Sequence, residues 1–343
     1  MELRIFGRFR DSLLETRENL LGWLNTSPAP EKRTCLGPAN EQAVRRHLQV
    51  VGTALEKTSD NTLGQCIVCG GYVEPGLLEM DYTANVCLDH LSEEEKRKLE
   101  FELELAQSAQ KTLLPQEIPD IPGLEISAFS RPAQIIGGDY FDFFQFRNGA
   151  HGFAIADVAG HGVSASLHMA SVQTVLRTLV PVSGSPTDVV KQMHHIYSHN
   201  IRFTTFVTLF LGAYDPVTHT LVYCNAGHNP PLIFRSTGDE KDRLIWLQPT
   251  GAAIGLVEEL GYTTGTIQLQ TGDILVLYTD GITEARNHRG QMFGSMHLAE
   301  IVQESWRSPA KSLVQAIRQG LQDFTDSAPF EDDATIIVSK IDH

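Results

Sequence analysis

Aspartates in glycine-rich turns recur where short apolar segments begin or end, and this pattern constrains the fold more than any other feature of the chain. Asp139 follows two glycines and precedes an aromatic run, and Asp157 ends the apolar run 153–156. Glycine permits backbone conformations closed to other residues, so such turns are typical of strand ends. A buried carboxylate with few basic residues nearby is costly unless a cation neutralises it. The stretch 137–162 therefore predicts strands that carry a site for a hard divalent metal ion.

Two further acidic turns extend this pattern. Asp280 follows the apolar segment 274–278, and Asp332 and Asp333 directly precede the apolar segment 334–338. Taken one at a time, each aspartate is an ordinary turn residue. Together the turns describe an oxygen-ligand site for one or two Mg²⁺ or Mn²⁺ ions, and the chain contains no Gly-x-Ser-x-Gly elbow that would supply a serine nucleophile.

The charge balance limits the partners of this protein. The 343 residues include 27 Lys and Arg against 42 Asp and Glu, a formal net charge of −15, which argues against nonspecific binding to nucleic acid or to an anionic membrane. No apolar run approaches the ~18 residues that a membrane span needs, and charges interrupt the first twenty residues throughout, unlike a signal peptide. We therefore expect a cytoplasmic globular protein, and 42% hydrophobic residues provide for a sizeable core.

A cluster of cysteines forms the second strong signal. Cys66 and Cys69 are followed, seventeen residues later, by Cys87 and His90. Two turns that each offer two ligands with two residues between them can wrap a tetrahedral Zn²⁺. Because the chain has five cysteines and three of them lie in this cluster, metal binding in a reducing compartment is favoured over a disulfide framework.

The segments around this cluster resemble the zinc finger of the DksA/TraR family over residues 41–90. The resemblance rests on Ala54-Leu55-Glu56-Lys57, Gly64-Gln65-Cys66 and Gly76-Leu77-Leu78-Glu79. It implies one structural zinc, with His90 where the family usually has a fourth cysteine. It also implies RNA polymerase as a docking partner of this module.

Composition shifts divide the chain into four parts: an N-terminal helical segment (1–40), a helix with the zinc finger (41–90), a helical linker (91–115) and a larger domain (116–343). In the linker, Ser92 and Glu95 form a capping-box pattern and Pro115 ends the helix. Leu99 and Leu103 fall near a heptad seam. Two interpretations stay open, a short coiled coil that makes a homodimer and a helix packed on its own domain.

The larger domain is predicted to be α+β, a layered β-sandwich flanked by helices. Strands in groups with paired helices between them favour this class over an alternating parallel sheet. Strands are expected at 124–129, 140–146, 153–157, 205–214, 220–225, 231–234, 273–278 and 334–341. Helices are expected at 163–179, 186–199, 297–306 and 310–324.

Residues ~110–342 resemble the PPM family of metal-dependent serine/threonine phosphatases, in its bacterial SpoIIE-like or RsbU-like branch. The matching segments, in family order, are Leu113-Leu114-Pro115, Arg131-Pro132-Ala133, Gly137-Gly138-Asp139-Tyr140, Asp157-Val158-Ala159-Gly160-His161-Gly162, Asn225-Ala226-Gly227-His228-Asn229-Pro230, Tyr278-Thr279-Asp280-Gly281 with Glu284, and Asp332-Asp333-Ala334-Thr335. The resemblance implies two central β-sheets with a binuclear metal centre at one edge.

The resemblance also implies a ligand set for two Mn²⁺ or Mg²⁺ ions. Asp139, Asp157 and the Val158 carbonyl would hold one ion, and Asp157, Asp280 and Asp332 the other, with Asp333 as the alternative to Asp332. Two such ions lower the pKa of a bridging water, so that hydroxide can attack the phosphorus of a phosphoserine or phosphothreonine. In this branch the usual substrate is a phosphorylated anti-sigma-factor antagonist, and an upstream signalling protein would act through the N-terminal module.

Three conspicuous residues receive secondary roles. His161 stands two residues away from the position of the proposed general acid in eukaryotic members, so a loop-shaping role is favoured. Arg131 is the nearest upstream basic residue to Asp139 and a candidate phosphate contact. His228 is interpreted as structural. The rival hypotheses for the whole chain are a non-catalytic zinc-finger adaptor and an RNA-polymerase-docking regulator with a phosphatase-like binding domain.

Overall fold

A computed structural model describes residues 10, 13–14, 17–18, 21, 41–73, 78, 83–160, 162–200, 206–237, 243–256, 261–328 and 330–342. The chain divides into two compact units, Met1–Glu100 and Phe101–His343. No helix among these residues is long and apolar enough to cross a membrane. Most of the predicted N-terminal helical segment 1–40, like His161, lies outside the described residues.

The N-terminal unit is built on α3 (Glu41–Ser59), which matches the helix expected there. Val51, Ala54 and Leu55 on one face of α3 pack with Leu13 and Leu63 in a small apolar cluster. The chain then forms the turns that carry the cysteines and the short η1 (Leu88–His90). The described residues of this unit thus have a small apolar core of their own.

The linker is helix α5 (Glu93–Leu113), and its N-terminus has the predicted capping box. The Ser92 N–H donates to Glu95 Oε2 at 2.9 Å, and the Glu95 N–H donates to Ser92 Oγ at 3.3 Å. The Ser92 hydroxyl also donates to Glu95 Oε2 at 2.6 Å, and this bond, with that of the Ser92 N–H, lowers the pKa of Glu95. No residue of α5 is fully buried, so the helix is held by a few specific contacts rather than by a core face.

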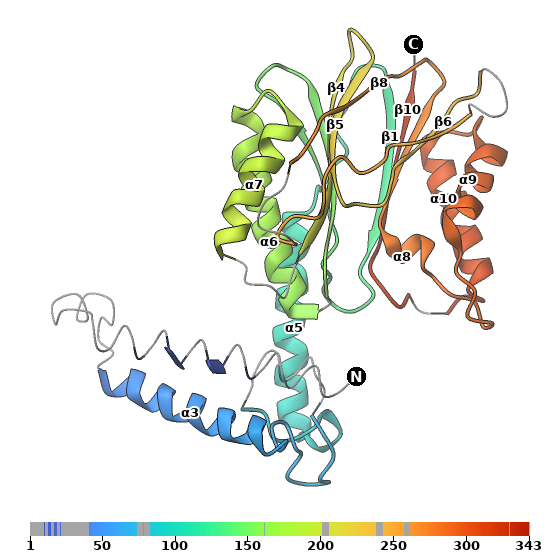
Figure 1. Cartoon of the computed structure of the whole chain (residues 1–343). Coiled ribbons are helices and arrows are strands. Elements are labelled where there is room, and N and C mark those ends of the chain that lie inside the picture. Colours follow the sequence, from blue (N-terminus) through green and yellow to red (C-terminus); the bar gives the residue numbers. More distant parts are fainter. Residues whose placement is uncertain are drawn as a thin grey trace. The chain divides into compact units, whose positions relative to one another are not determined.

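Two five-stranded antiparallel sheets form the centre of the C-terminal unit (Figure 1). The first sheet has the order β1-β10-β9-β6-β7, and its strands are β1 (Leu124–Arg131), β6 (Leu232–Phe234), β7 (Leu244–Trp246), β9 (Ile274–Tyr278) and β10 (Ala334–Ile341). The second sheet has the order β2-β3-β4-β5-β8, and its strands are β2 (Tyr140–Gln145), β3 (His151–Val158), β4 (Val207–Asp215), β5 (Thr220–Ala226) and β8 (Gly265–Gln268).

Helices cover the outer face of each sheet, which confirms the layered α+β prediction (Figure 1). The second sheet carries α6 (Gly162–Leu179) and α7 (Pro186–Asn200), joined by η2 (Val180–Val182), and the first sheet carries α9 (Gly294–Ser305) and α10 (Ala310–Phe324). Three short elements were not predicted from the sequence: the edge strands β7 and β8, of three and four residues, and the helix α8 (Asp280–Thr283). Such short elements carry too few residues to show a period.

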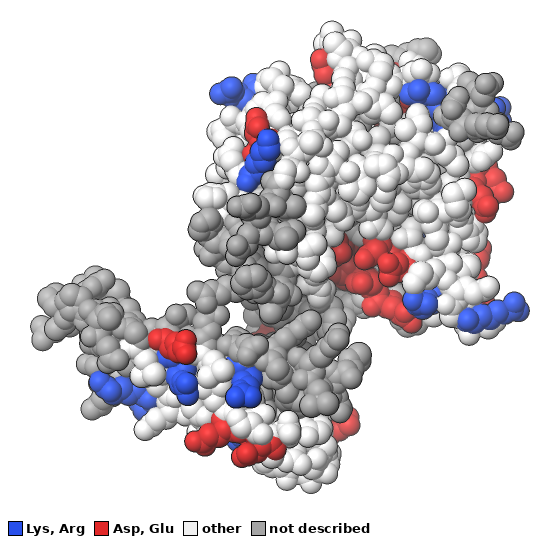
Figure 2. Space-filling view, in the orientation of Figure 1, with Lys and Arg blue, Asp and Glu red and all other residues white. Residues whose placement is uncertain are grey.

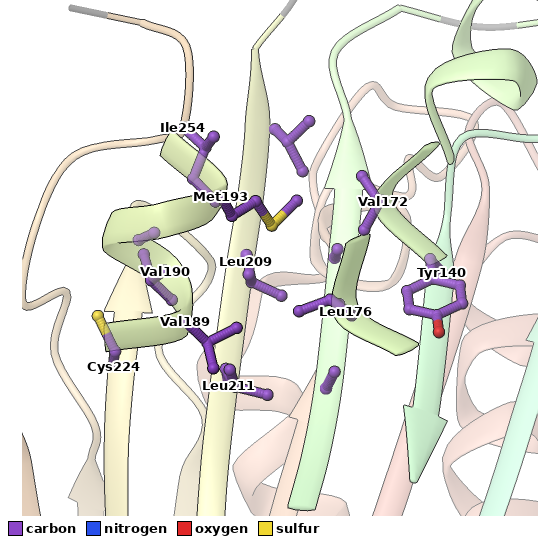
Figure 3. Packing of buried hydrophobic residues seen from close by; sticks show 14 of the residues in the cluster. Tyr140, Val172, Leu176, Val189, Val190, Met193, Leu209, Leu211, Cys224 and Ile254 are labelled. Atoms are coloured by element: carbon purple, nitrogen blue, oxygen red, sulfur yellow. The ribbon is translucent and has the colours of Figure 1, made fainter. Parts of the chain in front are cut away.

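Alternation along the strands divides the core into three layers. On β3, Phe153 and Ile155 face the other sheet, whereas Ala154 and Ala156 face the helices. Small side chains on that outer face allow Val172 and Leu176 of α6 to pack closely on the second sheet (Figure 3). Since side chains two residues apart share a face, Asp157 continues the row of Phe153 and Ile155 towards the edge of the space between the sheets.

Candidate metal centre

Strand register brings the predicted aspartates together in two pairs, one on each sheet. In the second sheet Tyr140 is registered with Ala156, so Asp139 and Asp157 are neighbours across the β2–β3 ladder. In the first sheet Tyr278 is registered with Ile336, which places Asp280 near the aspartates that precede β10. Figure 2 shows acidic side chains gathered in one patch beside α8.

Asp139 joins the two sheets. Its Oδ2 accepts hydrogen bonds from Thr279 Oγ1 at 2.8 Å and from Thr335 Oγ1 at 2.6 Å. Thr279 directly follows β9 and Thr335 lies at the start of β10, so both belong to the first sheet. Its Oδ1 is buried without a hydrogen-bond partner. Burial raises the pKa of Asp139 well above its usual value, and the charge of Asp157 raises it further. A buried carboxylate oxygen that lacks a donor is costly unless a cation occupies that side.

Asp333 has a different environment from the other acids, because backbone amides surround its carboxylate. The N–H groups of Ala133, Gly138 and Asp139 donate to it at 2.8, 2.6 and 3.4 Å. A Cβ at Gly137 would collide with this carboxylate, and one at Gly281 would collide with the Asp333 backbone carbonyl. The glycines of both motifs are therefore needed for the close approach of the loop before β10.

Asp157 and Asp280 are charged groups that repel one another. Burial, together with the charges of Asp280 and Asp332, raises the pKa of Asp157 to about 8. Burial also raises the pKa of Asp280 to about 6, with contributions from Asp332 and Glu284. Like charges held this close favour the protonated form unless a cation compensates them.

An all-oxygen donor set of this kind fits Mg²⁺ or Mn²⁺. The Val158 carbonyl lies next to the loop that carries Asp139, since its oxygen is 3.0 Å from the position that a Cβ on Gly138 would take. Among the described residues, one group of potential metal ligands has all its ligand atoms within 4.8 Å of one another, and this is the cysteine cluster. The oxygen atoms of the carboxylates are more widely spread.

That cluster is the predicted set Cys66, Cys69, Cys87 and His90. Cys87 Sγ lies 3.0 Å from His90 Nδ1 and 3.9 Å from Cys69 Sγ. The Cys87 backbone N–H helps to lower the pKa of Cys66 to about 6, whereas burial and the neighbouring thiols raise that of Cys87 to about 11. One thiolate is thus favoured before any metal binds, and thiolates are the form that ligates zinc.

Of the residues with secondary roles, two are described. Arg131 lies at the end of β1 with its guanidinium 5.3 Å from the centre of the Phe330 ring. His228 is buried, its Nδ1 lies 2.8 Å from Thr208 Oγ1, and burial lowers its pKa to about 4. This placement agrees with a structural role for His228.

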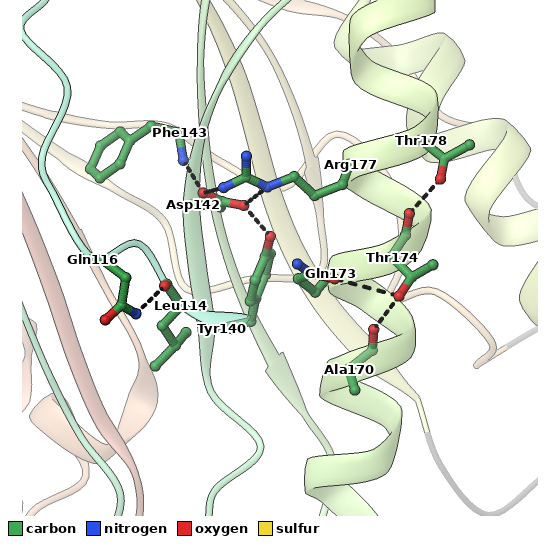
Figure 4. Close-up of polar contacts among 10 residues, drawn as sticks. All are labelled: Leu114, Gln116, Tyr140, Asp142, Phe143, Ala170, Gln173, Thr174, Arg177 and Thr178. Atoms are coloured by element: carbon green, nitrogen blue, oxygen red, sulfur yellow. Dashed lines mark hydrogen bonds and ion pairs between the residues drawn. The ribbon is translucent and has the colours of Figure 1, made fainter. Parts of the chain in front are cut away.

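Several residues that support the site were not assigned a role from the sequence. Thr279 and Thr335 stand in the quoted motifs, but nothing local indicates that both hydroxyls converge on Asp139. Asp142 is fully buried on β2, where it accepts two hydrogen bonds of 2.6 Å from Arg177 of α6 and one from the Tyr140 hydroxyl (Figure 4). A charged residue inside an aromatic strand was the available signal, because a buried charge requires a partner.

The end of α5 contacts the loop that carries Asp139. Gln110 Nε2 donates to the Gly137 carbonyl at 2.6 Å, and the Gly137 N–H donates to Gln110 Oε1 at 3.1 Å. Gln107 Nε2 donates to the Ile135 carbonyl at 2.9 Å. The side-chain amide of Gln110 thus pairs with the peptide group two residues before Asp139.

Comparisons with known proteins agree with this architecture. Residues 147–342 match the family model of stage II sporulation protein E (SpoIIE), a region that includes Asp157, Asp280 and Asp332 but not Asp139. Phosphoserine phosphatase RsbU of Bacillus subtilis is 30% identical over 246 residues, which are 71% of this chain and 71% of the relative. Phosphoserine phosphatase RsbP of the same organism is 25% identical over 244 residues, which are 70% of this chain and 58% of the relative.

Solved structures share the fold. The SiaA-PP2C domain of Pseudomonas aeruginosa has a TM-score of 0.62 at 20% identity and matches 72% of this chain and 99% of that domain. The SpoIIE phosphatase domain of Bacillus subtilis, with a fragment of its regulatory domain, has a TM-score of 0.55 at 19% identity and matches 64% of this chain and 63% of the solved one. Since the family model matches more than half of the chain and the RsbU relative is covered over two thirds of its length, the chain belongs to the SpoIIE family of PPM-type (PP2C) phosphatases.

Proposed function

We propose that this protein hydrolyses phosphoserine or phosphothreonine on a regulatory protein with the help of two Mn²⁺ or Mg²⁺ ions. The observation that carries the proposal is the buried, unpartnered Oδ1 of Asp139 beside an Asp157 whose pKa is raised to about 8. Such a set of acids is destabilising for the fold alone, and it becomes favourable when divalent cations occupy it.

We assign Asp139, Asp157 and the Val158 carbonyl to one ion and Asp157, Asp280 and Asp332 to the other. When bound, such ions provide a nucleophilic water near neutral pH and neutralise charge on the phosphoryl oxygens. The residues of the chain hold this arrangement in place. Thr279 and Thr335 orient Asp139. Because we assign Asp157 to both ions, we expect it to be the least replaceable ligand.

Asp332 is preferred over Asp333 as the ligand for two reasons. The carboxylate of Asp333 already accepts three backbone hydrogen bonds, which leaves it fewer lone pairs for a metal ion. Asp332 is exposed, accepts one hydrogen bond, from the Asp333 N–H, and its charge acts on both Asp157 and Asp280.

The test is hydrolysis of p-nitrophenyl phosphate by the purified full chain with Mn²⁺, with Mg²⁺ and in EDTA. We expect Asp157→Asn to lower kcat by on the order of 10³-fold. Equal rates in the wild type and in Asp157→Asn would refute the enzymatic function and leave the adaptor hypothesis. The relatives named phosphoserine phosphatase support a phosphoserine substrate, and a phosphorylated anti-sigma-factor antagonist is the first protein to assay.

We further propose that Cys66, Cys69, Cys87 and His90 hold one structural Zn²⁺, as expected for a protein that works in a reducing cytoplasm. Metal content measured by atomic emission on the protein purified without chelator tests this. One zinc per chain in the wild type and none in Cys66→Ser is the expected result.

The N-terminal module and α5 are proposed to regulate or recruit the phosphatase. The hydrogen bonds of Gln110 to Gly137 support this proposal, because a displacement of α5 would act on the loop of Asp139. An upstream signalling protein, RNA polymerase or a second copy of the chain through α5 are the candidate partners. If deletion of residues 1–90 changes neither activity nor oligomeric state, this part of the proposal is wrong.

A further inference from the structure

His228 lies in the connection that takes the chain from β5 of the second sheet to β6 of the first. It is part of the turn 225–230. The His228 N–H donates to Asn225 Oδ1 at 2.8 Å, which fixes the turn. The preceding Gly227 has φ +65°, and a Cβ there would lie 2.7 Å from the Ala253 nitrogen, so the backbone is held tightly.

One edge of the imidazole lies behind Asp157. His228 Nδ1 is 2.8 Å from Thr208 Oγ1, and Thr208 is the residue of β4 registered directly opposite Asp157. The same hydroxyl lies 3.5 Å from the Asp157 carbonyl. Because opposite residues of an antiparallel pair place their side chains on the same face, Thr208 stands beside the Asp157 carboxylate.

The other edge of the imidazole approaches the segment that carries Asp280. Nε2 is buried and makes no well-formed hydrogen bond. It lies near the Tyr278 carbonyl, which raises the pKa of the ring, but burial has the larger effect and lowers this pKa to about 4. Tyr278 ends β9, two residues before Asp280. The neighbouring Asn229 also reaches this segment, with Nδ2 at 3.5 Å from Thr283 Oγ1 on α8.

A single neutral tautomer suits both sides of the ring. With the proton on Nε2, the imidazole presents a donor towards the Tyr278 carbonyl and an acceptor towards the Thr208 hydroxyl. The ring therefore spans the space between the sheets at the edge where the aspartates gather. An apolar side chain of similar size could form a hydrogen bond with neither the Tyr278 carbonyl nor the Thr208 hydroxyl.

We infer that His228 is a positioning residue that sets the distance between Asp157 on one sheet and Asp280 on the other, and through that distance the affinity of the site for divalent cations. This inference rests on the proposed metal-dependent function. Metal ligands must be held to within about 0.5 Å of their working geometry, and groups behind the ligands commonly change metal affinity by ~10–100-fold.

The experiment measures Mn²⁺ binding to the purified full chain by calorimetry, together with kcat and KM at saturating Mn²⁺. We expect His228→Leu to weaken Mn²⁺ binding by ~10–100-fold, with little change in KM for the phosphorylated substrate once Mn²⁺ is saturating. His228→Gln, whose side-chain amide offers both a donor and an acceptor, is expected to retain part of the affinity. Thr208→Val should weaken binding in the same direction, and the double variant with His228→Leu should be no weaker than His228→Leu alone.

His194→Leu is the matched control. His194 is also a buried histidine, it belongs to α7, and its Nδ1 lies 3.3 Å from the Tyr262 hydroxyl. This control should lower the melting temperature and leave Mn²⁺ affinity unchanged. Mn²⁺ affinity equal to wild type in His228→Leu, His228→Gln and Thr208→Val would overturn the inference and leave His228 as a residue of the fold alone. If His228→Leu does not fold, the other two variants decide. Absence of Mn²⁺ binding in the wild type would overturn the proposed function together with this inference.

Discussion

At the scale of residues, the aspartates differ in how their charge is compensated. Three backbone amides surround Asp333, two hydroxyls contact one oxygen of Asp139, and Asp157 faces mainly other acids. Burial raises the pKa of Asp333, and its amide hydrogen bonds offset part of this rise, whereas the neighbouring acids add to the rise at Asp157 and favour protonation or a cation there. The same sequence element, an aspartate at a strand end, thus accepts backbone hydrogen bonds at Asp333 and, in the proposed function, binds metal at Asp157.

Asp157→Asn should stabilise the metal-free protein at high pH. The pKa of Asp157 is raised from 3.8 to about 8, so the folded state binds more protons than the unfolded chain between these values. Its contribution to stability is therefore fully present below about pH 4 and is lost as the pH rises towards 8. In EDTA at pH 8 we expect the melting temperature of the variant to exceed that of the wild type by about 2–4 °C for each kcal/mol of repulsion removed. At pH 5 the difference in melting temperature should be smaller. Identical melting temperatures at both pH values would contradict the repulsion.

Alanine at Asp332 and at Asp333 should separate binding from stability. Asp333→Ala leaves three amides without an acceptor and should cost about 1–3 kcal/mol in the free energy of unfolding. Asp332→Ala removes an exposed side chain, should cost less than ~1 kcal/mol, and should abolish binding of one of two Mn²⁺ ions. Urea unfolding in EDTA and titration calorimetry measure the two effects. The assignment would be reversed if Asp333→Ala lost the ion and Asp332→Ala retained it.

At the scale of elements, an ion pair between a buried carboxylate and a half-exposed guanidinium fastens α6 to the second sheet. Asp142 lies three residues after Asp139 on β2, and Arg177 lies on the helix that follows the Asp157 turn. The guanidinium contacts both carboxylate oxygens, and Arg177 also lies over the Phe144 ring. This pair holds together the two elements that follow the first two metal-site aspartates.

Arg177→Met should lower the free energy of unfolding by about 2–3 kcal/mol, because a buried carboxylate loses its cation and retains hydrogen bonds from the Tyr140 hydroxyl and the Phe143 amide. The estimate is below the full cost of an unpaired buried charge, since the Arg177 side chain is 51% exposed. Arg318→Met is a suitable control, as that guanidinium stacks over Phe129 and should contribute under ~1 kcal/mol. Equal losses in the two variants, measured by urea unfolding, would show that the ion pair adds nothing.

At the scale of the whole molecule, the chain divides into two units with different sources of stability. The C-terminal unit has three apolar layers around two sheets. The described residues of the N-terminal unit include one small apolar cluster and four potential zinc ligands. With the proposed zinc bound, this unit would depend on its metal for folding, because the binding free energy of a structural zinc is also folding free energy.

Removal of zinc should therefore unfold one unit and spare the other. Cys66→Ser is expected to make residues 41–90 sensitive to limited proteolysis while the full chain keeps its wild-type Mn²⁺ affinity, because the Mn²⁺ ligands all lie within the C-terminal unit. Proteolysis with mass spectrometry and calorimetry on the same sample provide the two measurements. A parallel loss of Mn²⁺ affinity would show that the acidic site depends on the zinc module.

The sequence alone determined most of the C-terminal architecture, because long strands and amphipathic helices carry periods of two and 3.6 residues that depend only on local geometry. It also supplied the four aspartates and the cysteine cluster, since glycine-rich turns and paired ligands are local patterns. Only the tertiary structure placed Thr279 and Thr335 on Asp139, Arg177 on Asp142 and His228 behind Asp157. These contacts join residues that lie 20 to 196 positions apart, and their partners are set by strand register and sheet packing, which no local pattern encodes.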